Sequence, residues 1–441
     1  MNNNGPAHTF PRLLLRQAQV RADKPAYRQK GLGIWQSWSW AQVADEVRAL
    51  ACGLAALGFK RGMNLAVIGD NRPRLYWAMA AAQCLGGVAV PVYQDAPAAD
   101  MAYVLDNADI DFAVVEDQEQ VDKLFEIKEK LNRISRIIYD NTRGMRHYTQ
   151  PELASFEEVQ RRGREFDRAH PGFFSGEVDA GKADDVAVIL YTSGTTGKPK
   201  GVCQTHASFI AAASGGAGFD RLTEHEEVLS YLPMAWIGDH LISFAQALVA
   251  GFTVNCPESG DTVMTDLREI GPTYYFAPPR VFENMLTAVM VRMEDAGAIK
   301  RRMFHHYLEV ARRVGADILD RKPVGLMDRI RYALGNVLVY GPLKNALGLS
   351  RVRVAYTTGA AIGPDLFRFY RSIGVNLKQL YGSTETCAYV CLQPDGHIRS
   401  GSVGQPAPGV EVRLAPDGEV LVKSPSMLKA YYKLPDATAE A

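Results

Sequence analysis

The densest group of residues able to do chemistry follows an apolar segment at positions 186–190. Residues 191–202 read Tyr-Thr-Ser-Gly-Thr-Thr-Gly-Lys-Pro-Lys-Gly-Val. Glycines let several backbone N–H groups converge on one anion, hydroxyls add donors, and lysines add mobile positive charges. This pattern predicts a polyphosphate-binding loop. Its expected ligand-binding residues are Thr192, Ser193, Gly194, Thr195, Thr196, Gly197, Lys198 and Lys200.

Two other interpretations of this loop are less favoured. A Walker A loop needs GxxxxGK[ST], whereas Gly194 and Gly197 enclose only two residues and Pro199 follows Lys198. The pattern therefore disfavours a P-loop kinase or GTPase. An ordinary surface turn rich in Gly, Ser and Thr rarely combines this length with two lysines and a preceding buried strand.

Three further segments fit the loop in order and spacing. Residues 356–361 read Tyr-Thr-Thr-Gly-Ala-Ala, and residues 379–385 read Gln-Leu-Tyr-Gly-Ser-Thr-Glu. A later stretch carries Gly418-Glu419, Ala430-Tyr431-Tyr432 and the segment 435–438. Together these motifs resemble the adenylate-forming superfamily, which includes acyl-CoA synthetases, luciferases and peptide-synthetase adenylation domains. The late motif departs from the family pattern, because Ser424 and Ala430 stand where glycines are usual.

The resemblance implies attack of a carboxylate on the α-phosphate of ATP, giving acyl-AMP and pyrophosphate, with CoA as second substrate. Two anions must meet, so the site needs compensating positive charge. By resemblance, Thr192 and Glu385 hold Mg²⁺, Lys198 and Lys200 steady the β- and γ-phosphates, and Thr384 reaches the α-phosphate. The implied nucleotide pocket is completed by Tyr381 stacked on adenine and by Gly359, Ala360, Ala361, Gly382 and Ser383.

The acyl side is expected around residues 231–240, Tyr-Leu-Pro-Met-Ala-Trp-Ile-Gly-Asp-His. In long-chain fatty-acid ligases this region often reads YLPLxHxFE, so Trp236 stands for the His and Asp239 for the Glu. Trp236 and Gly359 are candidate substrate residues, although an ordinary packed Trp is a serious alternative. His206 is a third candidate, with a structural histidine equally expected.

These motifs need a scaffold that brings them together. Apolar strands alternate with amphipathic helices from residue 38 onward, and a second such series begins at residue 186. The expected fold is therefore α/β, with two doubly wound subdomains plus a small β-barrel-like subdomain. The expected parts are residues 1–182, with loops and short elements over 140–182, residues 183–400, with a helical insertion at about 284–350, and residues 401–441, the start of the small β subdomain.

Composition narrows the function classes. The formal net charge is zero, so nothing global indicates nucleic acid, and the six cysteines show no zinc-ligand spacing. Reduced thiols in a cytoplasmic protein are expected. The insertion is rich in arginine, which predicts either a solvated helix face or peripheral contact with an anionic membrane that carries fatty acid.

The family motifs that normally follow residue 438 are missing, so we expect the C-terminal cap domain to be absent and this polypeptide to be impaired. The expected function is activation of a hydrophobic, fatty-type carboxylic acid. The alternatives are a domain that binds ATP or acyl-adenylate without turnover, a fatty acyl-AMP ligase with a carrier-protein acceptor, and a ligase for an aryl or other unusual acid.

Overall fold

The computed structural model describes residues 8–128, 133–192 and 197–441. Its largest sheet has eight strands in the order β19-β9-β8-β4-β3-β5-β6-β7. The strands are β3 (Asn64–Ile68), β4 (Val88–Val92), β5 (Ile110–Val115), β6 (Arg136–Tyr139), β7 (Leu153–Ser155), β8 (Val186–Thr192), β9 (Lys200–Thr205) and β19 (Ala430–Tyr431). Strands β3 to β8 run parallel, whereas β9 and β19 are antiparallel additions. The predicted α/β class is confirmed.

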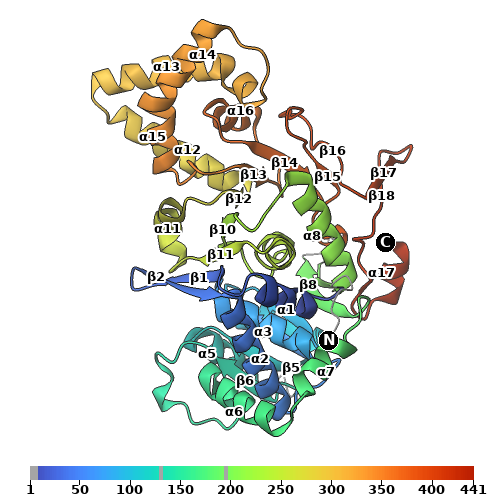
Figure 1. The fold of residues 1–441 in the computed structure, drawn as a ribbon. Coiled ribbons are helices and arrows are strands. Elements are labelled where there is room, and N and C mark those ends of the chain that lie inside the picture. Colours follow the sequence, from blue (N-terminus) through green and yellow to red (C-terminus); the bar gives the residue numbers. More distant parts are fainter. Residues whose placement is uncertain (1–7, 129–132, 193–196) are drawn as a thin grey trace.

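Helices cover this sheet on both sides (Figure 1). They are α1 (Phe10–Val20), α2 (Trp40–Ala56), α3 (Pro73–Cys84), α4 (Ala98–Asn107), α5 (Gln118–Glu126), α6 (Phe156–Ala169) and α7 (Phe173–Ala180), with the short turn η2 (Met145–His147). Helix α2 begins after a capping residue, because the Ser39 side chain accepts a hydrogen bond from the backbone of Gln42 at 3.3 Å. Strand β3 is fully buried, which agrees with the apolar run at residues 65–68.

The expectation of loops and short elements over 140–182 is wrong for α6, a helix of 14 residues. Ser155 caps it by accepting a hydrogen bond from the Glu158 backbone at 3.2 Å. Phe156, Val159 and Gly163 are buried along one face against α2, at helical spacing. The many charged residues of this segment lie on the opposite, solvated face, so its composition did not reveal the buried apolar face of the helix.

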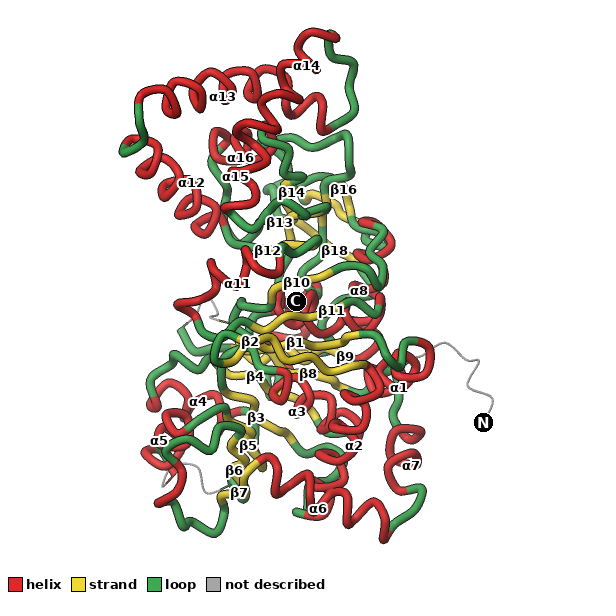
Figure 2. The backbone as a smooth tube through the Cα atoms, turned by 60° about the vertical axis from the view of Figure 1, so that its left-hand side comes forward, coloured by secondary structure: helices red, strands yellow, loops and turns green. Residues whose placement is uncertain are grey.

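Two further sheets stand beside the large one. The first has the order β10-β11-β1-β2, with β10 (Glu227–Leu229), β11 (Thr253–Cys256), β1 (Pro25–Gly31) and β2 (Ile34–Ser39). The second has the order β12 (Tyr274–Phe276), β13 (Val354–Thr357), β14 (Leu377–Tyr381), β15 (Cys391–Leu392) and β16 (Gln405–Pro406). Figure 2 shows the strands of these sheets stacked through the middle of the molecule, with helices outside them.

The strand series that starts at residue 186 was expected to form a sheet of its own, and this prediction is wrong. Strand β8 pairs in parallel with β4 of the large sheet, and β11 pairs in parallel with β1 near the N-terminus. Of the described strands in this series, β12, β13 and β14 form a parallel unit of their own. Periodicity identifies strands but carries no information about their neighbours, so the sheet assignment of β8 and β11 could not be predicted.

The segment expected as a helical insertion is helical and lies at one end of the molecule (Figure 1). It contains α12 (Pro279–Glu294), α13 (Ala298–Leu319), α14 (Leu326–Gly335), η5 (Asn336–Tyr340) and α15 (Gly341–Ala346). Phe282, Phe304 and Leu308 pack with β13 and β14 residues in one apolar core. Other helices before residue 373 are α8 (His206–Asp220), α9 (Ile237–Asp239), η3 (His240–Gln246), α10 (Ala247–Ala250), η4 (Gly260–Thr262), α11 (Val263–Ile270) and α16 (Pro364–Ser372).

After the turn η6 (Thr384–Thr386), the chain forms an antiparallel pair, β17 (Glu411–Leu414) with β18 (Val420–Lys423). It then returns to the large sheet as β19 and closes with α17 (Pro435–Glu440). All six cysteines are buried free thiols. Among the described residues, no helix combines the length and apolarity needed to cross a bilayer.

Candidate active site

The two ends of the glycine-rich loop lie side by side. Thr192 ends β8 and Lys200 begins β9, and these residues are direct partners in the antiparallel pair. Of the loop itself, Ser193, Gly194, Thr195 and Thr196 lie outside the described residues. Gly197 has a positive φ of 109°, a backbone conformation that favours glycine. The strand pair therefore fixes where the loop leaves the sheet and where it returns.

Both lysines of the loop lie over tyrosine rings. Lys198 Nζ is 5.2 Å from the centre of the Tyr103 ring, and Lys200 Nζ is 5.3 Å from the centre of the Tyr431 ring. Such contacts orient an ammonium group without neutralising its charge. In the part of the chain that the structure describes, neither lysine forms an ion pair with a carboxylate. Their charges are therefore available to an anionic ligand.

Glu385 is held close to this loop by three contacts. The Gln204 side chain on β9 donates to the Thr384 carbonyl at 2.8 Å and to the Glu385 carbonyl at 3.2 Å. The Tyr431 hydroxyl donates to Glu385 Oε1 at 2.8 Å. Since the Tyr431 ring also faces Lys200, one tyrosine connects the carboxylate to the loop lysine.

Tyr431 belongs to the late motif, but the sequence alone assigned it no role. Burial, with Glu385 as a second cause, raises the pKa of its hydroxyl to about 12, so the hydroxyl stays a donor at neutral pH. The late motif contains this tyrosine, but its position beside Glu385 depends on the pairing of β19 with β9. No local sequence pattern predicts that pairing.

The adenine-side candidates lie at the carboxyl ends of the neighbouring parallel strands β13 and β14. The Thr358 hydroxyl donates to the Leu380 carbonyl at 2.9 Å, which ties the two strand ends together. Gly359 turns the chain with a φ of 89°. Tyr381 is 42% exposed, and Ala360 and Ala361 are also exposed. An exposed aromatic ring at a strand end is available for stacking.

A cavity of about 460 Å³ joins several of these segments. One part of its lining carries hydroxyl groups from the ends of β8 and the η6 turn, and the other part is apolar and aromatic. Ala360, Ala361, Tyr381, Lys198, Lys200 and Glu385 are outside the lining, with Glu385 next to Thr384 at its edge. The lining residues are Tyr93, Tyr191, Thr192, Ala235, Trp236, Ile237, Gly238, Leu241, Ile242, Phe276, Thr358, Gly359, Leu380, Gly382, Ser383, Thr384, Ala388 and Tyr389.

On the apolar side, Trp236 lines the cavity and is 38% exposed, just before α9. The next helical residues are fixed by a buried carboxylate, Asp239. It accepts hydrogen bonds from Tyr76 at 2.7 Å, from Ser243 at 2.9 Å and from Ser230 at 3.0 Å. Burial raises the Asp239 pKa to about 7 despite these donors. Asp239 thus anchors the wall that carries Trp236 and does not itself line the cavity.

His206 does not line the cavity. It is buried at the start of α8, and its Nδ1 accepts a hydrogen bond from the Phe10 backbone at 3.3 Å. Burial lowers its pKa to about 4, so the ring is neutral near pH 7. The structure therefore places this predicted substrate residue in the packing between α1 and α8, which favours the structural alternative.

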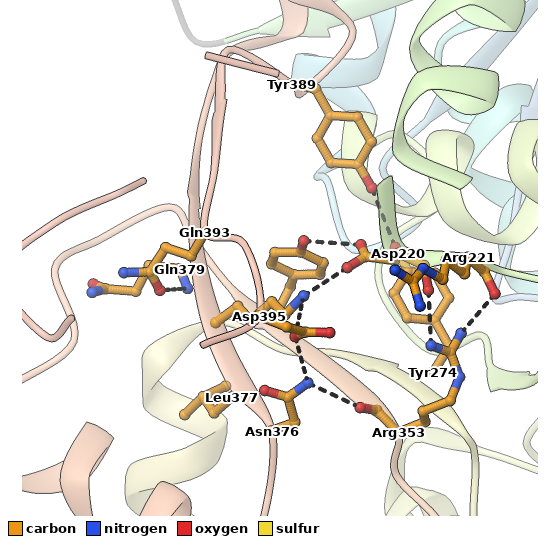
Figure 3. Close-up of polar contacts among 12 residues, drawn as sticks. Asp220, Arg221, Tyr274, Arg353, Asn376, Leu377, Gln379, Tyr389, Gln393 and Asp395 are labelled. Carbon is orange, nitrogen blue, oxygen red and sulfur yellow. Dashed lines mark hydrogen bonds and ion pairs between the residues drawn. The ribbon is translucent and has the colours of Figure 1, made fainter. Parts of the chain in front are cut away.

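Polar contacts join β13 and β14 to the end of α8 (Figure 3). Lys378 is 1% exposed and forms ion pairs with Asp220 at 2.8 Å and with Asp395 at 2.9 Å. The hydroxyls of Tyr274 and Tyr389 lie 3.2 Å apart, and Tyr389 lines the cavity. Of the two Lys378 ion pairs, the one with Asp220 is buried on both sides, and removing Lys378 would leave the Asp220 carboxylate buried without its charge partner, so this pair holds β14 against the end of α8.

The donor groups at the cavity edge fit a hard divalent cation that keeps most of its water. Thr192, Ser383 and Thr384 offer hydroxyls, and Glu385 offers one carboxylate. Within residues 8–128, 133–192 and 197–441, no group of three or more His, Cys, Asp or Glu side chains could enclose a metal ion. One carboxylate beside a phosphate site is the arrangement by which proteins bind Mg²⁺ together with a nucleotide.

Comparisons with known proteins agree with this geometry. The long-chain-fatty-acid–CoA ligase FadD15 of Mycobacterium tuberculosis is 28% identical over 416 residues, which cover 93% of this chain and 66% of that protein. The chain thus spans about two thirds of the length of this relative. Two solved structures share the fold. The N-terminal domain of FACL13 from Mycobacterium tuberculosis has a TM-score of 0.67 at 18% identity, covering 98% of this chain and 93% of that chain.

The second is an anthranilate CoA ligase, AuaEII, in complex with anthranoyl-AMP, with a TM-score of 0.72 at 18% identity over 98% of this chain and 73% of that chain. The model of the family described as AMP-binding enzyme matches residues 14–432, nearly the whole chain. The motifs, the fold and this match agree, and the chain belongs to the AMP-binding enzyme family.

Proposed function

We propose that this chain binds ATP and a hydrophobic carboxylic acid, of the fatty-acid type, and joins them as an acyl-adenylate, with CoA as the acceptor of the acyl group. The observation that carries the proposal is the shared cavity. Thr192 from the loop strand, Thr384 from the YGSTE turn, Gly359 from the adenine turn and Trp236 from the acyl side all line it.

In this proposal the hydroxyl side of the cavity takes the phosphates and the apolar side takes the acyl group. Lys198 and Lys200, which form no ion pairs in the described chain, offset the charge of the two reacting anions. Thr192 and Glu385 would hold Mg²⁺, which supplies charge neutralisation on the phosphates. Tyr381, Gly359, Ala360, Ala361, Gly382 and Ser383 are proposed around the nucleotide, and Ser193, Gly194, Thr195, Thr196 and Gly197 around the phosphates.

The domain division is also a proposal: residues 1–182, residues 183–400 with the helical insertion, and residues 401–441. Strand β8 crosses the first boundary: it follows residue 182 in sequence, but it pairs with β4 of the first part. The cavity draws its lining from both sides of that boundary, with Tyr93 before it and Trp236 after it. The first two parts therefore act as one unit at the site.

ATP–pyrophosphate exchange over a panel of saturated fatty acids and aryl acids tests the proposed chemistry. We expect exchange that requires a fatty acid and Mg²⁺ and that drops strongly in Lys200→Ala. Exchange with aryl acids alone would favour the aryl-acid alternative, for which Trp236, Phe276 and Tyr389 in the lining are the supporting observation. Binding of ATP with no exchange for any acid would favour a domain without turnover.

We also propose that the chain works in the cytoplasm and touches an anionic membrane through α14 and η5. Leu326, Met327, Leu334 and Val337 are 75%, 62%, 51% and 72% exposed there. A helix normally buries such residues, and an exposed apolar patch marks a contact surface. The neighbouring Arg329 is exposed too, so charge favours anionic lipid.

Co-sedimentation with vesicles tests the membrane contact. We expect binding to vesicles that contain phosphatidylglycerol, weaker binding to phosphatidylcholine alone, and loss of binding in Leu326→Gln/Val337→Gln. The matched control is Leu414→Gln/Val420→Gln, which changes exposed apolar residues on the β17–β18 pair. Equal loss in both double variants would refute a specific role of α14.

A further inference from the structure

A second apolar hollow lies between the helical insertion and α11, and it shares no lining residue with the cavity beside Trp236. It has a volume of about 410 Å³ and is enclosed by α11, α12, α13, η5 and α15. This volume lies within the range of small-molecule sites, about 300–1,000 Å³. The hollow is therefore large enough for a ligand of its own.

Four methionines line this hollow, Met264, Met285, Met293 and Met303, more than any other residue type. Met285 and Phe304 are buried at 3% and 4% exposure, whereas Met264 and Leu338 are 37% and 46% exposed. The hollow therefore has a buried floor, at Met285 and Phe304, and a solvent-exposed mouth, at Met264 and Leu338. Flexible thioether side chains adapt to unbranched apolar ligands of varying shape. These features suit an alkyl chain better than a rigid ring.

Three cations also line the hollow: Arg268, Arg292 and Lys300. Each is exposed, so their charged groups lie toward the solvent side. Arg268 donates to the Met264 carbonyl at 2.9 Å and to the Thr265 hydroxyl at 3.3 Å. In the described part of the chain, none of the three forms an ion pair with a carboxylate, although ion pairs such as Arg313 with Asp328 occur elsewhere in the insertion.

We propose that this hollow is a second, non-catalytic binding site for one single-chain fatty-acid carboxylate, with the alkyl chain among the methionines and the carboxylate near Arg292 and Lys300. An apolar floor with unpaired cations on the lining is complementary to an anionic amphiphile. The choice of a fatty acid rests on the proposed function, whereas the hollow and its charges do not. Leu338 belongs both to this lining and to the exposed apolar surface of η5, so the mouth opens beside the surface proposed to meet lipid.

Photo-crosslinking separates this site from the catalytic cavity. The probe is a C16 fatty acid with a terminal diazirine, and labelled peptides are mapped by mass spectrometry in the presence of a saturating non-hydrolysable acyl-adenylate mimic. We expect labelling within residues 264–304 to persist under these conditions. We expect it to fall by about three- to tenfold in Arg292→Gln/Lys300→Gln, because exposed charge pairs are individually weak.

The matched control is Arg301→Gln/Arg302→Gln, which removes two cations of α13, the helix that carries Lys300. Neither is in the lining, so this variant should label like the wild type. The methyl ester of the probe should label this region less than the acid. Loss of labelling on addition of the mimic, or equal labelling by acid and ester, would overturn the proposal. Failure of the exchange reaction would leave this labelling unaffected, so the two proposals fail separately.

Discussion

Tyr431 and Glu385 are 46 residues apart in sequence, yet the hydroxyl of one donates to the carboxylate of the other at 2.8 Å. The same ring faces Lys200, so this tyrosine touches both the proposed metal-binding carboxylate and a proposed phosphate-binding lysine. At the scale of single residues, Tyr431 is therefore a positioning residue of the site. Its contribution can be measured separately from its contribution to folding.

Replacing Tyr431 by Phe should weaken binding of Mg²⁺–ATP by about fivefold, with a small change in thermal stability. A hydrogen bond to a charged acceptor contributes about 1.5–3 kcal/mol when buried, and this pair is only half-buried. Isothermal titration gives the dissociation constant. Tyr432→Phe is the matched control, because its hydroxyl bonds to Asp109 at 3.0 Å and not to Glu385. Equal effects of both variants would contradict a positioning role.

The raised pKa of Asp239 predicts that the stability of the fold depends on pH. Its pKa is about 7 in the folded chain, whereas an unfolded aspartate titrates near about 3.9. Between these values the folded state binds more protons than the unfolded state, so this group's contribution to stability falls as pH rises. Relative to Asp239→Asn, the wild type should lose up to about 4 kcal/mol of unfolding free energy from about pH 4 to about pH 8.

Urea unfolding of both proteins across this pH range measures the difference. The comparison with Asp239→Asn is needed because burial lowers the pKa of His206 to about 4, which makes that residue destabilising as pH falls. The histidine contribution is common to both proteins and cancels in the difference. A difference that stays constant, or that rises with pH, would contradict the assigned protonation of Asp239.

At the scale of elements, helices α2 and α6 approach each other through glycine. A Cβ atom added at Gly163 would lie 1.8 Å from the Ala49 carbonyl oxygen, which no side-chain rotation can relieve. In sequence this glycine lies in a segment of mixed charge that gives no sign of close packing. The contact is a tertiary constraint, and it accounts for part of what the sequence did not predict.

Gly163→Ala should destabilise the chain by up to about 2 kcal/mol, since overpacking costs about 1–3 kcal/mol and the gain in helix propensity is about 1 kcal/mol. Gly176→Ala in α7 is the control, because a Cβ there meets no atom within 4 Å, and it should be neutral or slightly stabilising. Thermal unfolding compares the two variants. Destabilisation of the same size in both would show that helix packing at Gly163 is not the cause.

Local patterns were sufficient for much of the secondary structure and for the family. The capping Ser39 and the fully buried β3 are local signals, and the structure follows them. Residues whose role depends on long-range pairing were assigned less well. His206 stood next to the loop in sequence but lies in packing against Phe10, 196 residues away. Tyr431 reaches Glu385 only because β19 pairs with β9.

At the scale of the whole molecule, the cavity forms where separate sheets meet. Thr192 comes from the eight-stranded sheet, Gly359 follows β13 and Leu380 lies on β14 of the second sheet, and Trp236 lies between β10 and α9. No single element contains the site, so any movement between the sheets changes its shape. The buried ion pair between Lys378 on β14 and Asp220 on α8 limits the movement of β14.

The central claim is that one cavity holds both the nucleotide and the acyl group. Titration of the chain with a non-hydrolysable acyl-adenylate mimic tests it most directly, with Thr384→Val in the cavity lining and Thr265→Val on α11 as control. We predict one binding site per chain, an affinity at least about fivefold weaker in Thr384→Val, and no change in Thr265→Val. Binding that is absent in the wild type, or equally tight in Thr384→Val, would contradict the account.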